Sequence, residues 1–401
     1  MIEIEKLTND QELIKDFVES LSKKYDSEYF LKKVKNKEFP IELWNEIANN
    51  GYLGIIVPEK YGGGNFGIDD LRVFVGEMAK NGLMSFQLVS QIIVCDIMHK
   101  YGNDEQKNKY LPEIISGARC SFAFSEPDAG TNTFNIVTDA FKEEEHYKLS
   151  GHKTYITGVK ESKYMLVVAR TASNNDLKDI SKSPTISLFF VDPKSKGINI
   201  TPQNIGFRST SEREEMLITG DVQYDIYFDD VIVPKENLIG KENEGIGYLY
   251  NTFNLLKIMI AAMAIGWGKN VLNKAVEYAK KRTVFEDPIG SYQAIQHPMA
   301  RAITDLELAN LANQIASKAC DSEEDINLVT TYANVARYVA SEAAYEAWDI
   351  AMQSYGGYSL DREYGIITLW QPILSTRIIP ISNEVILDHF CKHGLGLPNS
   401  Q

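Results

Sequence analysis

Phe122-Ala-Phe-Ser-Glu-Pro-Asp-Ala-Gly-Thr-Asn132 stands at the junction between a helical region and a run of alternating strands. Glu126-Pro127 predicts a turn, and Gly130 would let the backbone approach a bound group closely. Ser125 and Thr131 offer hydroxyl groups that can face the same partner as nearby backbone N–H groups. Taken alone, the stretch is more typical of an ordinary strand-to-loop turn than of a binding site, because short motifs are weak signals.

Upstream of this stretch, apolar residues recur at helical spacing. Leu13, Phe17 and Leu21 are four residues apart, which predicts an amphipathic helix. Residues 87–101 form a further apolar segment of helical length. We therefore expect a helical N-terminal domain over residues 1–118.

Between residues 119 and 236 the apolar period changes to two, which is typical of half-buried strands. Polar loops separate the predicted strands, notably at 171–184 and 208–215. Short connections without helical crossovers favour an antiparallel sheet or barrel. The predicted strands cover residues 147–156, 164–168, 186–191 and 222–228.

After Pro234 the helical period returns and continues to the end of the chain. The three segments 251–282, 294–318 and 325–355 are each long enough for a full helix of a bundle, and a last apolar helix covers 384–390. We expect a C-terminal four-helix bundle over residues 237–401. The predicted fold class is α+β, with a helical domain, a middle antiparallel β-barrel-like domain and this bundle.

The net charge, the apolar stretches and the cysteines of the sequence exclude several classes of function. The 401-residue chain has a formal net charge of -14, which argues against nucleic acid and anionic membrane surfaces as partners. The longest apolar stretch, 258–267, is too short to span a bilayer. Cys95, Cys120, Cys320 and Cys391 are scattered and form no ligand cluster, so we expect reduced thiols, no metal site and a cytoplasmic protein.

The order of these domains, with several separated motifs, resembles the acyl-CoA dehydrogenase family over nearly the whole chain. The opening stretch is similar to the family's flavin-binding motif. Lys153-Thr-Tyr-Ile-Thr157 resembles the segment in which an aromatic residue lies against the flavin and a threonine bonds near its reactive nitrogen. The resemblance implies FAD as the cofactor, bound by Phe122, Phe124, Ser125, Thr131, Tyr155 and Thr157.

Two motifs of the C-terminal domain resemble segments that reach the FAD of a neighbouring subunit. They are Arg282-Thr-Val-Phe285, followed by Gln293, and Gln353-Ser-Tyr-Gly-Gly357. An FAD pyrophosphate needs a cation and backbone donors, and an arginine with two glycines supplies both. The resemblance therefore implies a homodimer or homotetramer, with further cofactor contacts from Arg282, Phe285, Gln293, Gln353, Gly356, Gly357, Ser382 and Glu384.

The chain departs from the family where the chemistry is decided. Family dehydrogenases use a glutamate to remove the proton alpha to a thioester, while hydride leaves the beta carbon for the flavin. The usual position of that base is Pro380, within Arg377-Ile-Ile-Pro-Ile-Ser-Asn-Glu384, and the alternative position on the long helix is Leu256. Neither side chain can accept a proton, so the catalytic residue stays unidentified. The resemblance implies substrate contacts from Thr131, Asn254 and Lys257.

These departures leave several functions open. We expect an FAD-dependent α,β-dehydrogenation of an acyl thioester, carried on CoA or on an acyl carrier protein, with a non-standard base. A flavin-dependent monooxygenase or N-oxygenase on the same fold is the alternative, because such an enzyme needs no base. A catalytically inactive protein that binds flavin or a thioester is a third. The expected redox partner is an electron-transfer flavoprotein, oxygen or a flavin reductase.

Overall fold

The computed structural model describes residues 4–132, 135–171, 185–203, 205 and 221–398. The chain folds into two compact units. Unit 1 comprises Met1–Leu31, Gly67–Met84 and Phe253–Gln401, and unit 2 comprises Lys32–Phe66 and Ser85–Thr252. Residues 1–118 are thus shared between the units, and the three-domain division stays a prediction.

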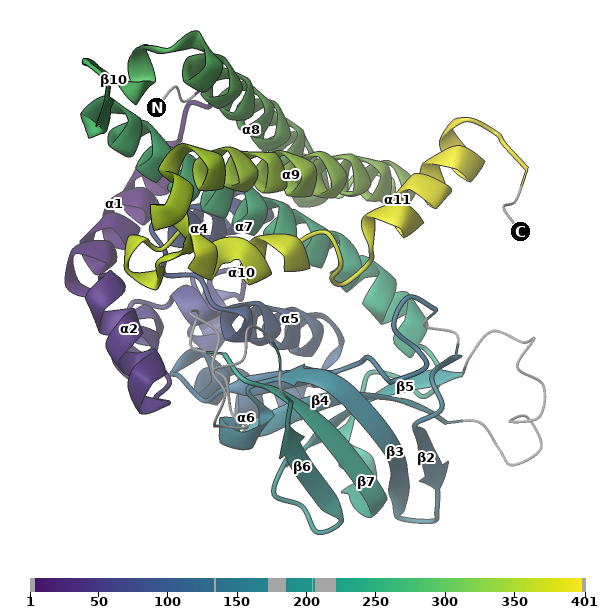
Figure 1. Cartoon of the computed structure of the whole chain (residues 1–401). Helices are drawn as coiled ribbons and strands as arrows, with labels where there is room; N and C mark the ends of the chain where they lie inside the picture. Colours follow the sequence, from purple (N-terminus) through teal and green to yellow (C-terminus); the bar gives the residue numbers. More distant parts are fainter. Residues whose placement is uncertain (1–3, 133–134, 172–184, 204, 206–220, 399–401) are drawn as a thin grey trace. The chain divides into compact units, whose positions relative to one another are not determined.

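Unit 1 is built from helices (Figure 1). Among them, α8 and α9 lie side by side, and α4 packs against both α1 and α8. Its helices are α1 (Asn9–Lys24), α4 (Ile68–Lys80), α8 (Gln293–Asp321), α9 (Ile326–Tyr355), α10 (Trp370–Ser375), α11 (Asn383–His389) and most of α7 (Gly245–Lys281), with a short hairpin of β9 (Thr283–Val284) and β10 (Asp287–Pro288). The predicted long helices at 251–282, 294–318 and 325–355 are confirmed as α7, α8 and α9.

The long helix α7 is apolar enough by length and composition to pass for a membrane span, but 94% of its most apolar window is buried inside the protein. Close packing explains that burial within unit 1. A Cβ added at Gly266 of α7 would lie 2.4 Å from the carbonyl oxygen of Gly76 in α4. Only glycine allows the two backbones to approach this closely, so α7 is a core helix of the unit.

Over its described residues, unit 2 combines helices with an eight-stranded sheet. Helix α5 packs on strands β1 and β3 and on α6. Ser85 and Asp221 cap the N-terminus of α5, and the carboxylate of Asp221 accepts from the backbone N–H of Phe86 at 2.8 Å. The helices are α3 (Ile41–Asn49), α5 (Phe86–Tyr101) and α6 (Asp104–Ile115), with α2 (Ser27–Asn36) crossing from unit 1.

The sheet of unit 2 runs in the order β6-β7-β3-β2-β4-β5-β8, and β1 pairs with β4 outside this path. Most pairs are antiparallel, but β1 and β2 each run parallel to β4, so the expectation of a purely antiparallel sheet is wrong at these pairs. A long loop and the β2–β3 hairpin separate β1 from β4, which gives the chain room to return in the same direction. The strands are β1 (Cys120–Ala123), β2 (Asp139–Lys142), β3 (His146–Thr157), β4 (Tyr164–Arg170), β5 (Ile186–Val191), β6 (Ile198–Pro202), β7 (Gln223–Pro234) and β8 (Leu238–Ile239).

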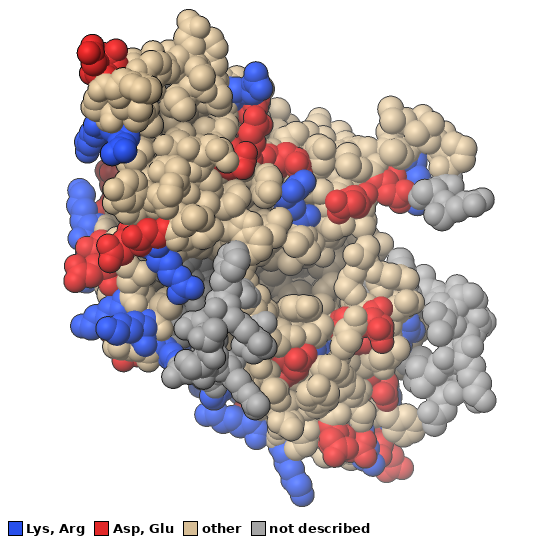
Figure 2. Space-filling view, viewed as in Figure 1, with Lys and Arg blue, Asp and Glu red and all other residues tan. Residues whose placement is uncertain are grey.

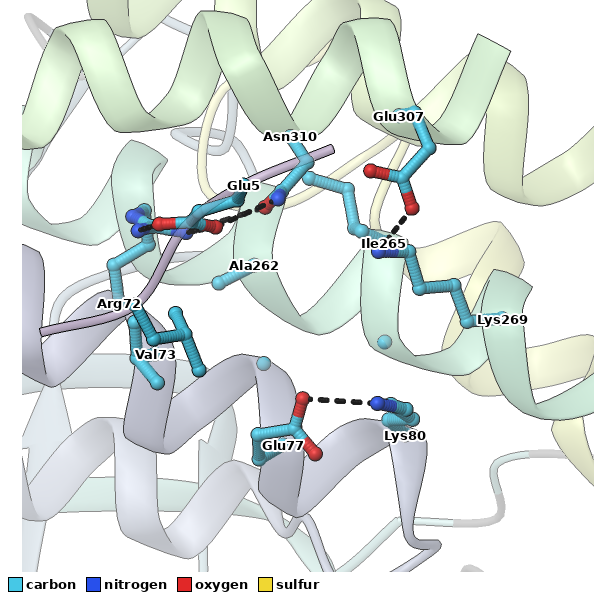
Figure 3. Close-up of a pocket in the computed structure, with 13 residues that line it drawn as sticks. Glu5, Arg72, Val73, Glu77, Lys80, Ala262, Ile265, Lys269, Glu307 and Asn310 are labelled. Carbon is cyan, nitrogen blue, oxygen red and sulfur yellow. Dashed lines mark hydrogen bonds and ion pairs between the residues drawn. The ribbon is translucent and has the colours of Figure 1, made fainter. Parts of the chain in front are cut away.

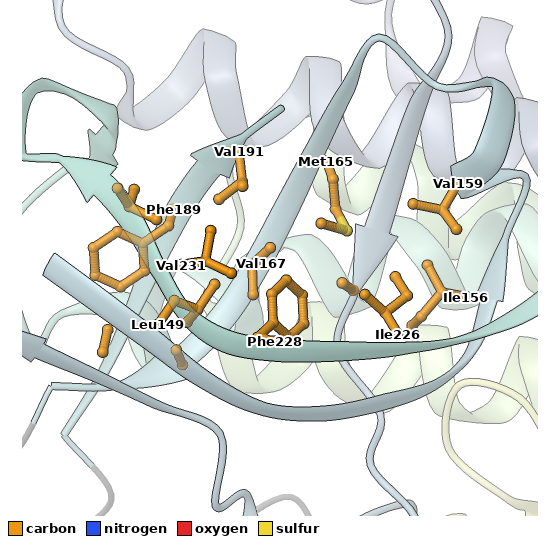
Figure 4. Packing of buried hydrophobic residues seen from close by; sticks show 14 of the residues in the cluster. Leu149, Ile156, Val159, Met165, Val167, Phe189, Val191, Ile226, Phe228 and Val231 are labelled. Atoms are coloured by element: carbon orange, nitrogen blue, oxygen red, sulfur yellow. The ribbon is translucent and has the colours of Figure 1, made fainter. Parts of the chain in front are cut away.

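Alternate residues of these strands form one apolar core in unit 2 (Figure 4). Leu149 from β3, Val167 from β4 and Phe189 from β5 are fully buried in it. Ile226 and Phe228 of β7 point into the same core, two residues apart as the strand period requires. The predicted polar loop at 208–215, and that at 171–184 except for its first residue, lie outside the described residues.

Charged side chains of both signs are interspersed over the face drawn in Figure 2.

The four cysteines are free thiols, as expected from their spacing. Cys95 and Cys120 are buried, and burial raises the pKa of the Cys95 thiol to about 12. A thiol with so high a pKa stays protonated and unreactive.

Candidate functional site

In unit 2, the loop that follows β1 is held by a buried ion pair. Glu126 accepts from Nζ of Lys153 at 2.8 Å, and it also accepts from the backbone N–H groups of Val137 and Thr138. Lys153 donates in addition to the carbonyl of Phe124 at 2.9 Å. These contacts join the loop to β3 and to the segment before β2. The backbone of the opening stretch is therefore fixed from two sides.

Burial acts on the pKa values of both partners. It lowers the pKa of the Lys153 amine to about 8, although the Glu126 carboxylate acts in the opposite direction. Burial would raise the pKa of Glu126, but the charge of Lys153 and the hydrogen bonds hold it below its ordinary value. The pair is therefore ionised at neutral pH.

Ser125 adds a second connection between the loop and β3. Its hydroxyl donates to the carbonyl of Thr154 at 2.6 Å, and the Thr154 N–H donates to the carbonyl of Ser125 at 3.0 Å. The Ser125 hydroxyl can therefore offer a ligand only its lone pairs. The rings of Phe122 and Phe124 stack 5.7 Å apart, and Thr131 is exposed on the far part of the loop.

Tyr155 is displayed to solvent by an irregularity in β3. The register of β3 against β7 shifts between Lys153 and Ile156, and Tyr155 within that shift has a φ of 58°. A left-handed backbone is unfavourable for an aromatic residue, and its cost of about 1–3 kcal/mol is usually tolerated at functional positions. The Tyr155 side chain is 64% exposed. Two residues on, the Thr157 hydroxyl lies 2.9 Å from Nε2 of Gln223.

In unit 1, a hollow of about 490 Å³ brings together four of the residues singled out in the sequence. They are Arg282, at the end of α7, and Gln353, Gly356 and Gly357, at the end of α9. Stacked tyrosines form part of its wall, with the rings of Tyr278 and Tyr355 4.2 Å apart.

The hollow contains the unpaired guanidinium of Arg282 and the unobstructed backbone of Gly356 and Gly357. Within the described residues, no hydrogen bond or ion pair engages the side chain of Arg282. A Cβ at Gly356 or Gly357 would meet nothing within 4 Å, and the φ of Gly356 is 58°. Phe285, which is 93% exposed on the hairpin, and Gln293, at the start of α8, do not line the hollow.

A second hollow in unit 1 shows what a structural cluster of charges looks like (Figure 3). Arg72 there donates to Glu5 and to the side chain of Asn310, and Lys269 lies 2.6 Å from Glu307. These cations already have partners within the protein. Within the part of the chain that the structure describes, the guanidinium of Arg282 is free, whereas Arg72 and Lys269 are already paired, so Arg282 is the better candidate for binding a ligand.

The loop before α11 is anchored by Arg337 of α9. The Arg337 guanidinium donates to the carbonyls of Ile379 and Ile381 and, at 2.9 Å, to the side chain of Asn383. Pro380 lies between these two carbonyls. The loop is therefore fixed with a proline, which has no titratable group, at its centre.

The ends of this loop carry polar contacts of their own. Asn383 also donates to Glu342 at 2.6 Å, and Glu342 accepts from Arg377 at 2.8 Å. Glu384 is exposed, and hydrogen bonds from its own backbone N–H and from the Ser382 hydroxyl lower its pKa. The Glu384 carboxylate is thus held at the first turn of α11.

Lys257 and Asn254 lie one turn apart on the buried face of α7. Lys257 donates to Oδ1 of Asn254 at 3.4 Å, and Nδ2 of Asn254 donates to the Thr330 hydroxyl at 2.9 Å. Burial and the charge of Arg337 lower the pKa of Lys257 to about 8. Leu256, between them, is also buried. The partners of Asn254 and Lys257, which are Thr330 and Arg337, belong to unit 1 as well.

Sequence reasoning missed Lys153 as the partner of Glu126 and Arg337 as the anchor of the loop around Pro380. A signal existed for both. Lys153 occupies an inward position of an alternating strand, and Arg337 interrupts the alanine-rich face of a core helix. A charged residue at such a position is rarely tolerated without a specific partner.

Three family models match the chain. They are the acyl-CoA dehydrogenase N-terminal domain at residues 8–118, the middle domain at 121–231 and the C-terminal domain at 243–394. Together they account for most of the sequence.

Individual proteins match over nearly the same length. Acyl-CoA dehydrogenase fadE12 of Mycobacterium bovis is 35% identical, and the match covers 98% of each chain. The caffeyl-CoA reductase-Etf complex subunit CarC of Acetobacterium woodii is 30% identical, over 90% of each chain. The structure of butyryl-CoA dehydrogenase from Megasphaera elsdenii superposes with a TM-score of 0.85 at 26% identity, covering 96% of this chain and 97% of that one.

Proposed function

Because this chain belongs to the acyl-CoA dehydrogenase family, we propose that it is an FAD-dependent enzyme that converts an acyl thioester into its α,β-unsaturated form. The family assignment makes it a flavoprotein oxidoreductase acting on CH–CH donors. The proposal adds the direction of the reaction and the residues that carry it out.

The main support for the proposal is the exposed position and left-handed backbone of Tyr155. An aromatic ring that is 64% exposed on a left-handed backbone is unfavourable for an isolated protein. The ring lies two residues from Thr157, on a strand tied to the opening stretch by Lys153. A planar ligand stacked on Tyr155 would remove this apolar surface from water.

The residues present also fit the rest of FAD. The free guanidinium of Arg282 and the open backbone at Gly356-Gly357 supply a cation and donors for a pyrophosphate. In the proposed arrangement they serve the FAD of a neighbouring copy, which makes the protein a homodimer or homotetramer. Phe285, exposed on the hairpin that follows Arg282, would then be covered by the neighbour.

In the proposed reaction, some residues of the chain orient the flavin and others contact the substrate. FAD, when bound, supplies the hydride-accepting chemistry. Thr157, held by Gln223, and the backbone of the loop fixed by Glu126 orient the flavin. Ser382 and Glu384, at the start of α11, and Gln353 add polar contacts. Thr131, Asn254 and Lys257 face the substrate thioester, which we place on CoA because the curated relatives carry CoA in their names.

The proposed redox partner is an electron-transfer flavoprotein, since CarC is a subunit of a complex with Etf. A cytoplasmic location is part of the proposal and is supported by the four free thiols.

The proposal is tested by the composition of the product. The purified protein is incubated with an artificial electron acceptor and, in separate reactions, with butyryl-, isobutyryl-, octanoyl- and 3-phenylpropionyl-CoA. The masses of the products are measured by mass spectrometry. We expect at least one thioester to lose two hydrogens. A product that instead gains oxygen, and forms only with reduced flavin and oxygen, would replace the dehydrogenase by a monooxygenase. Tight FAD binding without any product would leave a binding protein.

A further inference from the structure

Lys257 differs from the other buried lysines of the described residues. Among the residues that the structure describes, the buried lysines are Lys153, Lys257 and Lys269. Lys153 lies 2.8 Å from Glu126, and Lys269 lies 2.6 Å from Glu307. Lys257 has no carboxylate within ion-pair distance in the part of the chain that the structure describes, and its hydrogen bond to Asn254 is long at 3.4 Å. Its amine is buried without a counter-charge.

The neighbouring elements bring positive charge to Lys257. Arg337 of α9 is fully buried and acts electrostatically on the lysine, and Nε of Arg337 has no partner among the described residues. The pKa of His389 in α11 is lowered chiefly by burial. The charges of His393 and Lys257 lower it further. Glu342, the acid that acts electrostatically on Arg337, bonds to Arg377 and Asn383.

A lysine in such surroundings gives up its proton more readily than an exposed one. Burial disfavours the ammonium form, and a second cation disfavours it further. Enzymes use both devices to obtain a neutral lysine that can act as a base near pH 7–8. The pKa of Lys257, lowered to about 8, lies in this range.

The loop that contains Pro380 is connected to the same group of residues. Arg337, the cation beside Lys257, donates to the carbonyls of Ile379 and Ile381 on either side of Pro380. Buried carboxylates elsewhere in the described part of unit 1 are already engaged, since Asp69 binds Arg72 and Glu307 binds Lys269. Lys257 is therefore a buried group of this unit that can accept a proton in its neutral form.

We propose that the Lys257 amine is the base that removes the alpha proton of the substrate, an inference that rests on the proposed dehydrogenase function. The Cα–H bond breaks and its proton goes to the neutral Nζ, which becomes an ammonium group. The electron pair of that bond becomes the new Cα=Cβ bond, and FAD, when bound, would accept the hydride that leaves Cβ. The electron-transfer flavoprotein then reoxidises the cofactor, and Nζ returns the proton to solvent.

The test separates proton removal from hydride transfer. The holoenzyme is mixed anaerobically in D₂O with the acyl-CoA panel named above, and two rates are followed: exchange of the α-hydrogen for deuterium and bleaching of the flavin. Lys257→Arg keeps the cation but cannot act as a base, and Lys257→Met removes the charge. Lys269→Arg makes the same change at a buried lysine that is paired.

We expect both Lys257 variants to bind FAD and to lose exchange and bleaching by about a hundredfold or more, with Lys269→Arg within threefold of the wild type. The wild-type rate should rise about tenfold per pH unit below pH 8 and level off above it. In ¹⁵N-lysine-labelled apoprotein, Lys153 and Lys257 should each give an Nζ signal that titrates near pH 8, and one of these two signals should vanish in Lys257→Arg. Exchange within threefold of wild type in both Lys257 variants would overturn the assignment and leave the dehydrogenase intact. If the wild type neither exchanges nor bleaches with any thioester, the proposed function fails as well.

Discussion

Nζ of Lys153 lies 2.8 Å from Oε1 of Glu126, and both side chains are withdrawn from solvent. The lysine comes from β3 and the glutamate from the loop after β1. Each also binds backbone, Lys153 at the carbonyl of Phe124 and Glu126 at two N–H groups. The pair therefore fixes the loop relative to the strand that presents Tyr155.

Replacing Lys153 by methionine should destabilise the protein strongly. The change would leave the Glu126 carboxylate buried without its cation, which typically costs about 3–5 kcal/mol. The expected result is a lower free energy of unfolding, measured by urea denaturation.

Lys163→Met is the matched control for that variant. Lys163 pairs with Glu113 on the surface, and its side chain is 56% exposed. An exposed pair contributes about 0–1 kcal/mol, so this change should be nearly neutral. The double variant Glu126→Gln/Lys153→Met should recover part of the loss. Equal effects of Lys153→Met and Lys163→Met would contradict the role given to the buried pair.

Tyr155→Gly should separate stability from cofactor binding. Glycine accepts a φ of 58° without strain, so the apoprotein should be as stable as the wild type or slightly more stable. Loss of the stacking ring should weaken FAD binding by about tenfold. The measurement is a fluorescence titration of apoprotein with FAD. Tyr227→Ala removes another exposed aromatic residue of the same sheet and should leave the affinity unchanged; a similar loss in both variants would contradict the proposal.

Arg282→Gln should weaken FAD binding without affecting folding. The guanidinium is exposed and unpaired in the described structure, so its removal breaks no internal contact. Loss of a charge-assisted hydrogen bond to phosphate costs about 1.5–3 kcal/mol, or roughly tenfold to hundredfold in affinity. Lys281→Gln, at the adjacent exposed position, is the control. An unchanged FAD affinity in Arg282→Gln would remove the arginine from the proposed site.

The sequence predicted the elements of this fold well because their apolar residues repeat regularly. The period of two placed β5, and the helical period placed α7, α8 and α9. The parallel pairing of β1 with β4 was missed. Strand direction depends on how a long loop returns, and no local pattern in β1 encodes that path.

Lys257→Met should stabilise the apoprotein at pH 7, and the gain should vanish at alkaline pH. The folded pKa of Lys257 is about 8, below the ordinary value of 10.5, so the folded state binds fewer protons than the unfolded chain between these values. The cost of burying the ammonium is therefore fully present below pH 8 and disappears as the pH rises to 10.5.

We expect a gain of about 1–3 kcal/mol in the free energy of unfolding at pH 7. Urea denaturation of both proteins across the pH range measures it. A difference between wild type and variant that does not change with pH would show that Lys257 has an ordinary pKa in the folded protein.

The candidate site could be predicted from the sequence only in part. Motifs drew attention to Arg282, Gln353 and the glycines at 356–357, which the structure brings to one hollow. The interior contacts of Lys153, Arg337 and Lys257 could not be predicted, because each joins residues far apart in the chain. The sequence identifies Tyr155 as an aromatic residue of the candidate site, but its left-handed backbone follows from a register shift that only the sheet defines.

Anaerobic mixing of the oxidised holoenzyme with acyl-CoA tests directly whether this protein dehydrogenates an acyl thioester. The visible absorption of the flavin is followed after addition of each thioester of the panel, without oxygen and without another reductant. We expect at least one thioester to bleach the flavin, in proportion to the enoyl-CoA formed. A flavin that keeps its colour with every thioester, but reacts with oxygen once it has been reduced chemically, would contradict the account.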